Sequence, residues 1–232
     1  MDRTSKTAGR AARDKQAARL PPHLPAELSP GDRVVLEPDA EVQGISITGI
    51  ETDGDAVGVE VSGCRLVGVP LVGLDLSHAR ITDVSFERCD LSAATLVEAS
   101  LLRTEFVDCR LNGAVLSGAR LVHVGFRDCR MNGLELRMAT AEQLELTACD
   151  LAGADFYGSS LVGAAMTGCN LTGADCSRAT WTGARLHGST LNDLRGAADL
   201  AGVRIGSEQA VGVGLQLLAA VGITVDDEAE AP

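Results

Sequence analysis

Large apolar side chains recur at every fifth position through the middle of the chain. The series begins at Leu66, ends at Leu191 and holds 26 positions, all of them apolar, with no inserted or deleted residue. The residue two positions before each of these is small or modest in size, and the remaining positions are mostly polar, glycine or charged. Each five-residue unit therefore supplies one large and one small inward side chain.

A period of five residues fits neither an α-helix nor an extended strand, whose side-chain periods are 3.6 and 2. It requires a chain that turns a corner once per unit, and four corners close a coil of 20 residues. A second period of 20 supports this interpretation, and it is clearest in five cysteines: Cys89, Cys109, Cys129, Cys149 and Cys169. Stacking of like residues from coil to coil is typical of a β-solenoid.

Several units also share the same or similar residue types at corresponding positions. Residues 89–93 are CDLSA, residues 149–153 are CDLAG, residues 154–158 are ADFYG and residues 169–173 are CNLTG. This resembles the A(D/N)LXX consensus of the pentapeptide-repeat family, over roughly residues 59–193. The resemblance implies an all-β solenoid in the form of a right-handed quadrilateral β-helix. The chain departs from the consensus where Arg, Ser, Thr or Val precedes the large residue.

The repeat register divides the chain into five parts. We expect a disordered basic and proline-rich arm over 1–30, an N-terminal cap with irregular first coils over 31–63, the repeat shaft over 64–195, a C-terminal cap over 196–225 and an acidic tail over 226–232. Within the C-terminal cap, residues 207–221 are expected to form a helix. Ser207 is its expected N-cap and Gly222 its expected stop.

The open ends of a solenoid are exposed sheet edges that invite aggregation, so each end needs a cap. The expected C-terminal helix has two apolar faces, with Val211, Leu215 and Leu218 on one and Val213, Leu217 and Val221 on the other. Two apolar faces need two surfaces to cover them. One face is expected to cap the last coil, and the other predicts a homodimer through this end. The alternative is a helix seated in a groove formed with residues 197–206.

Charge and composition narrow the class of protein. The chain has 32 acidic and 20 basic residues and a net charge of −12, which disfavours direct nucleic-acid binding by the shaft. There is no run of 18 apolar residues, so we expect no membrane-spanning helix and no membrane partner. The basic N-terminal residues are followed by no apolar segment of the kind a secretory signal carries. We therefore expect a cytoplasmic protein.

The residue types that usually carry chemistry are not brought together by the register. Cysteines 20 residues apart lie on parallel rungs that do not converge into a disulfide, and the CxxC pairs common in zinc sites are absent from the sequence. They are better explained as small buried side chains. The sequence also contains no glycine-rich phosphate-binding motif. We expect no metal, no cofactor and no catalytic residues, and hence a protein that is not an enzyme.

One outward column stands out because carboxylates stack in it. Asp75, Glu135, Asp155 and Asp175 share this column with Thr95 and Val115, and they form the candidate acidic interaction column. Stacked like charges repel one another, although solvent screens them when they are exposed. The simplest interpretation is a solvated face that follows the repeat consensus. The functional interpretation is a fragment of a DNA-like charge ladder.

Two functions remain open at this point. The first is a non-enzymatic scaffold or protein-interaction module of unknown partner, because a rigid rod without loops offers no converging polar pocket. The second comes from the resemblance, since some quinolone-protection members of the family are acidic rod-shaped dimers that mimic duplex DNA and bind DNA gyrase. It implies a DNA-mimic modulator of DNA gyrase or another type II topoisomerase. Against it, residues 64–193 hold 15 acids interleaved with 11 arginines.

Overall fold

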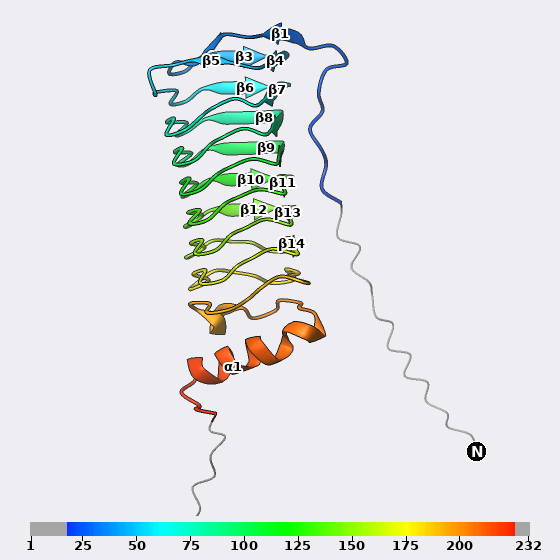
Figure 1. The fold of residues 1–232 in the computed structure, drawn as a ribbon, viewed down its shortest axis with the longest axis vertical. Helices are drawn as coiled ribbons and strands as arrows, with labels where there is room; N and C mark the ends of the chain where they lie inside the picture. The colour runs from blue at the N-terminus through cyan, green and yellow to red at the C-terminus, as the bar shows by residue number, and fades with distance from the viewer. Residues whose placement is uncertain (1–17, 226–232) are drawn as a thin grey trace, which may run out of the picture.

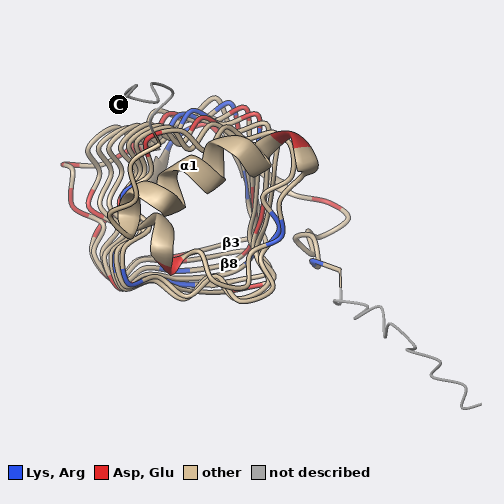
Figure 2. Cartoon of the chain, turned by 90° about the horizontal axis from the view of Figure 1, so that it is seen from below, with Lys and Arg blue, Asp and Glu red and all other residues tan. Residues whose placement is uncertain are grey.

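Each five-residue unit ends in a corner because the residue two places after its large side chain adopts a left-handed backbone conformation. All 26 corner residues have a positive φ, and 14 of them are not glycine. The computed structural model describes residues 18–225, in which four such corners per turn give a column of square cross-section (Figures 1 and 2). The column is a parallel β-solenoid of about seven turns, as the period of 20 predicts.

The strands are short segments on the flat sides of this column. They are β1 (Ser29–Gly31), β2 (Val34–Val35), β3 (Glu41–Gln43), β4 (Ile45–Ile47), β5 (Ile50–Glu51), β6 (Glu60–Ser62), β7 (Arg65–Val67), β8 (Arg80–Glu87), β9 (Ser100–Val107), β10 (Arg120–Val122), β11 (Gly125–Arg127), β12 (Thr140–Glu142), β13 (Glu145–Thr147) and β14 (Ala165–Thr167). Their pairings are parallel, and strands inside the shaft such as β8, β9 and β11 bond to the turn before and to the turn after. The register of 20 aligns Phe86 with Phe106 and Phe106 with Phe126.

The inward side chains fill the column as stacks of like residues. The Phe86 and Phe106 rings stack with centroids 4.6 Å apart, and Phe106 and Phe126 follow at 4.7 Å. Nearer the C-terminus, Phe156 meets Trp181 edge to face at 5.4 Å. Because one large and one small residue alternate around each turn, the narrow interior is filled with very few aromatic side chains.

The first turns are shorter than the rest. Val42 pairs with Val61, 19 residues later, and Ser29 pairs with Ile45, 16 residues later. The regular step of 20 begins where Val61 pairs with Ile81. The residues before the shaft thus continue its sheets in an irregular register and cover its N-terminal end.

The expectation of a disordered arm is wrong for the described part of that segment. Residues 18–28, called the strap below, run extended beside a corner of the shaft (Figure 1). Leu20 donates its N–H to His123 Nδ1 at 3.3 Å, and His23 donates its N–H to Asp83 Oδ1 at 2.8 Å. The prolines of this segment favour an extended chain and lack N–H groups, so few sheet partners are needed. Residues 1–17 of the predicted arm lie outside the described residues.

The C-terminal end is closed by two short 3₁₀ turns, Ala197–Asp199 and Ser207–Gln209, and by helix α1 (Ala210–Ala220), which crosses the open end of the column (Figure 2). Gln209 Nε2 donates to the carbonyls of Leu186, at 2.8 Å, and Ser189, at 2.6 Å. Gln216 Nε2 donates to the Leu191 carbonyl at 2.6 Å. These amide side chains replace the strand that the last turn lacks, and so they protect its edge.

The expected N-cap at Ser207 is wrong. Gly206 is the cap residue, its N–H is accepted at 2.7 Å by Gln209 Oε1, and Ser207 is the first residue of the 3₁₀ turn. On α1, Val213 is buried, whereas Val211 is 74% exposed and Leu215 is 48% exposed.

No helix within residues 18–225 is long and apolar enough to cross a membrane. The predicted acidic tail at 226–232 lies outside the described residues.

The corner geometry makes a stability prediction. Ala148 is an exposed corner residue with φ 52°, a region in which a Cβ is strained. Ala148→Gly should therefore stabilise the protein by about 1 kcal/mol, or raise Tm by about 2–4 °C. The matched control is Ala152→Gly, outside the corner positions, which should destabilise it by about 0.5–1 kcal/mol. Thermal unfolding followed by circular dichroism measures both, and a lower Tm for Ala148→Gly would contradict the corner strain.

Candidate functional site

The four residues of the candidate acidic interaction column lie in one column on one side of the shaft. Parallel bridges link Glu135 to Asp155 and Asp155 to Asp175 on successive turns. Asp75 lies three turns before Glu135, with Thr95 and Val115 on the rungs between them. The structure therefore brings three carboxylates together and leaves the fourth apart.

Three of these carboxylates hold the backbone. Oδ1 of Asp75 accepts the Ser77 N–H at 2.9 Å, and Oδ1 of Asp175 accepts the Ser177 N–H at 2.9 Å. Asp155 accepts the Tyr157 N–H in the same way at 2.8 Å. A short acceptor two residues before an N–H stabilises a turn, which explains why Asp or Asn precedes the large residue in many repeats. These residues thus have a structural role whatever else they do.

Arginines form ion pairs with two of the four carboxylates of the acidic interaction column. Arg137 Nη1 lies 2.7 Å from Asp155 Oδ2, and Arg195 Nε lies 3.4 Å from Asp175 Oδ2. The guanidinium of Arg137 also lies 4.7 Å from the centre of the Tyr157 ring. Hydrogen bonds from Ser177, together with Arg195 and Arg137, lower the pKa of Asp175 below its usual range. The column is a mixed-charge surface and not a continuous acidic one.

Arginines also pair with carboxylates on the other sides of the shaft. Arginines form ion pairs with carboxylates along the surface: Arg65 with Glu87, Arg80 with Glu60, Arg103 with Asp83, Arg110 with Asp90 and Arg120 with Glu142. The Arg103 guanidinium, at 2.6 Å from both oxygens of Asp83, lowers the pKa of that carboxyl. Exposed ion pairs add little stability. Their consequence is a surface on which positive and negative groups lie side by side.

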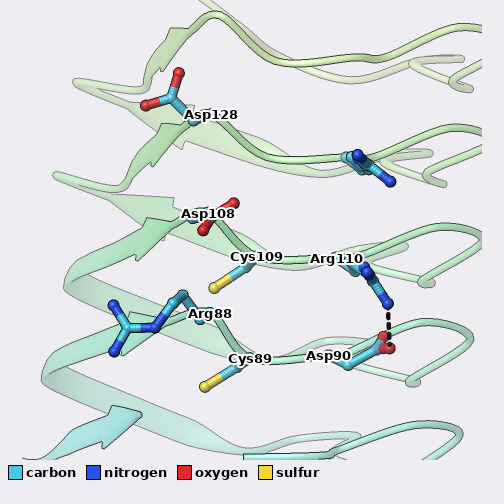
Figure 3. Close-up of a pocket in the computed structure, with 8 residues that line it drawn as sticks. Arg88, Cys89, Asp90, Asp108, Cys109, Arg110 and Asp128 are labelled. Carbon is cyan, nitrogen blue, oxygen red and sulfur yellow. Dashed lines mark ion pairs between the residues drawn. The ribbon is translucent and has the colours of Figure 1, made fainter. Parts of the chain in front are cut away.

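A groove of about 310 Å³ lies along one corner (Figure 3). Arg88, Asp108 and Asp128 line it on successive turns, and the Arg110–Asp90 ion pair, at 3.8 Å, forms its other side. The thiols of Cys89 and Cys109 lie beneath these charged groups and are buried. The groove is a strip of both charges, and its lining suits a charged polypeptide surface better than an apolar ligand.

The cysteines pack as small buried side chains. All seven are free and buried, and the Sγ atoms of Cys89 and Cys109 bond to the carbonyls of Leu66 and Phe86 at 3.5 and 3.4 Å. Burial raises the pKa of the Cys176 thiol to about 12, so this thiol is neutral at physiological pH. Within residues 18–225, no three His, Cys, Asp or Glu side chains are grouped so that they could hold a metal ion.

Reasoning from the sequence missed one contact that the structure shows clearly. The Arg19 guanidinium lies over Gly125, between Glu105 at 3.0 Å and Glu145 at 3.3 Å. The sequence does contain an indication of this contact. Gly125 is the one glycine of residues 64–193 that does not occupy a corner position. A glycine where the backbone does not require one indicates that something lies close to its Cα.

The geometry of the repeat agrees with the comparisons with known proteins. The model of the pentapeptide repeat region matches residues 79–156, and the model of pentapeptide repeats in eight copies matches residues 149–188 and 169–197. The matches together span half of the chain, and the protein belongs to the pentapeptide-repeat family. Members of this family are generally non-enzymatic structural or interaction proteins. No curated protein matches the chain.

Solved structures with the same repeat are similar to this chain. A trypsin-treated form of QnrB1, described as a plasmid-mediated fluoroquinolone resistance protein, is 23% identical, with 87% of this chain and 100% of that chain covered and a TM-score of 0.48. HetL, a pentapeptide repeat protein from the cyanobacterium Nostoc sp. strain PCC 7120 involved in heterocyst differentiation regulation, is 16% identical, with 77% and 90% covered and a TM-score of 0.34.

Proposed function

We propose that the protein is a non-enzymatic interaction module whose shaft binds another protein through its flat, charge-patterned sides. The observation that carries the proposal is the ladder of outward side chains. Arginines and carboxylates lie together on these sides and are held by ion pairs, as between Arg137 and Asp155 and between Arg110 and Asp90. A rigid surface of fixed, mixed charge complements a protein surface that carries both charges.

Single charge reversals on opposite sides of the shaft test this proposal. Arg110 and Arg120 are each ion-paired, with side chains 61% and 59% exposed, and they lie on opposite sides of the column. Immobilised wild type, Arg110→Glu and Arg120→Glu are used to capture partners, which are quantified by mass spectrometry. A protein that binds one side of the shaft should bind about tenfold less well to the variant changed on that side. It should bind the other variant as well as it binds wild type. Equal capture of every protein by all three forms would overturn the proposal.

A second candidate is a DNA-mimic modulator of DNA gyrase or another type II topoisomerase. The net charge of −12 and the rod shape favour it, because a DNA mimic must present carboxylates along its length. Its weakness is that Arg137 and Arg195 pair with Asp155 and Asp175 in the column that would have to imitate phosphates.

A supercoiling assay distinguishes the two functions. Purified gyrase is titrated with the protein, with and without a quinolone. Because the acidic column is interrupted by arginines, we expect neither inhibition nor protection at low micromolar concentrations. Inhibition that is weakened by Glu135→Lys, a change at an exposed column residue, would instead make the DNA mimic the function.

We also propose that two copies associate through α1. Val211 is 74% exposed and Leu215 is 48% exposed on one face of this helix. An exposed apolar face at the end of a rod suits a two-fold interface, in which the same surface of both copies is buried. Sedimentation should show a dimer for the wild type and a monomer for the double variant Val211→Glu, Leu215→Glu. Val72→Glu, at an exposed valine on the shaft, is the control and should remain dimeric, and a wild-type monomer would refute the interface.

A further inference from the structure

We propose that the corner of the shaft formed by Asp83, Glu105, Gly125 and Glu145 is a binding site for an extended protein segment that carries an arginine. The strap occupies this site in cis, so a partner segment has to displace it. The inference rests on the proposed function in one respect, namely that the shaft binds protein.

The centre of the site is the seat over Gly125. A Cβ on this residue would lie 2.6 Å from Cζ and 2.8 Å from Nε of Arg19, so with any other residue here the guanidinium would have to leave its present position. The backbone at Gly125 has no positive φ that would require glycine. Within the same column, the neighbouring turns carry Glu105 and Glu145. The missing side chain is therefore explained by the guanidinium and not by the fold.

The two carboxylates make the seat specific for a guanidinium. They stand two turns apart with nothing between them but the glycine, and each binds a different nitrogen: Glu105 accepts from Nη2 and Glu145 from Nε of Arg19. Only 12% of the Arg19 side chain is exposed. A planar group with several fixed donors can bridge carboxylates in this way, whereas the compact ammonium of lysine is a single point charge.

The site continues along the corner beyond the seat. His123 Nδ1 and Asp83 Oδ1 accept main-chain N–H groups of Leu20 and His23, and Pro25 lies beside Gly63. These contacts recognise an extended main chain without regard to side-chain identity. The chemistry of the ligand is thus an extended segment with one arginine, followed by residues that leave main-chain N–H groups free.

The strap holds this site with few bonds. Residues 18–28 form no strand, and Nη1 of Arg19 is buried without a hydrogen-bond partner among the described residues. A buried donor without a partner weakens binding. A partner segment that supplies an acceptor for this nitrogen would bind more favourably than the strap does, which makes the strap a displaceable cover over Glu105 and Glu145.

Trypsin tests whether the strap is docked in the full-length protein. The protease must take the Arg19 side chain into its own pocket to cut the Arg19–Leu20 bond, so a seated guanidinium protects that bond. Gly125→Ala should accelerate this cleavage at least about tenfold. The control is Ala165→Ser, which adds one atom two turns along the same column and should leave the rate unchanged. Equal cleavage rates in wild type and Gly125→Ala would overturn the seat.

If Gly125→Ala alters the circular dichroism or Tm, the double variant Glu105→Gln, Glu145→Gln removes the charges at nearly constant volume. It should also accelerate cleavage, and an unchanged rate in this variant overturns the seat in the same way.

Binding in trans tests whether the site accepts a partner. Full-length Arg19→Glu releases the strap by repulsion from Glu105 and Glu145, and a fluorescent peptide with the sequence of residues 18–28 is titrated into it. The peptide should bind at least about tenfold more tightly to this variant than to wild type. Binding should be lost when the peptide's arginine is alanine or when the protein also carries Gly125→Ala. No saturable binding, or equal binding to wild type, would overturn the proposal.

Neither measurement uses gyrase or a captured partner. Failure of the peptide to bind therefore removes the arginine site and leaves the proposed function of the shaft intact, whereas failure of the charge-reversal capture removes the proposed function alone.

Discussion

Main-chain hydrogen bonds between successive turns are the interaction on which the rest of the structure depends. Leu91 donates to the Arg110 carbonyl at 2.7 Å, and one turn later Leu111 donates to the Arg130 carbonyl at the same distance. Within the shaft such bonds keep like residues aligned only while each turn has 20 residues, because one extra residue would move the inward side chains that follow it to the outside. The uninterrupted step of five from Leu66 to Leu191 follows from this requirement.

The same bonding creates the difficulty at the ends, where a turn has partners on one side only. At the C-terminal end, the structure uses the amide side chains of Gln209 and Gln216 in place of a further strand. This arrangement orients α1 across the column, with Val213 inward and Val211 outward. The exposed apolar residues of the helix are therefore a consequence of how the sheet edge is satisfied, and they offer a second surface.

The repeat could be predicted from sequence because every unit reports on it independently. Cys89, Cys109 and Cys129, for example, all show the spacing of 20 residues. A single unit that departs from the pattern therefore does not change the predicted repeat. The strap and the helix start could not be predicted in this way, since each depends on contacts that occur once in the structure and do not repeat from unit to unit. Ser207 is the better cap by residue type, but Gly206 takes that place because Gln209 binds both the Gly206 N–H and the Ser189 carbonyl of the last turn.

The candidate acidic interaction column shows the limit of reading charge from a repeat. Its carboxylates do stack, as in the Glu135–Asp155–Asp175 run, but Arg195 occupies the next rung of the same column, and Arg137 pairs with the column from another position of the repeat. Sequence order separates Arg137 from Asp155 by most of a turn, and folding brings them to 2.7 Å. The electrostatic field that a partner meets is set by neighbouring columns together. The carboxylates of one column, counted alone, therefore overstate how negative that field is.

A strict repeat also makes its exceptions informative. At the position before the large residue, every unit of the shaft except one has a Cβ, and at that one, Gly125, an arginine from more than 100 residues earlier in the chain is seated. A corner glycine would carry no such information, because the corner itself accounts for it. In a solenoid the regular backbone accounts for the residue type at most positions. Function is therefore best sought at the positions whose residue type the repeat does not explain. Arg19 and its seat meet that criterion, whereas Asp155 and Asp175, which hold their own corners, do not.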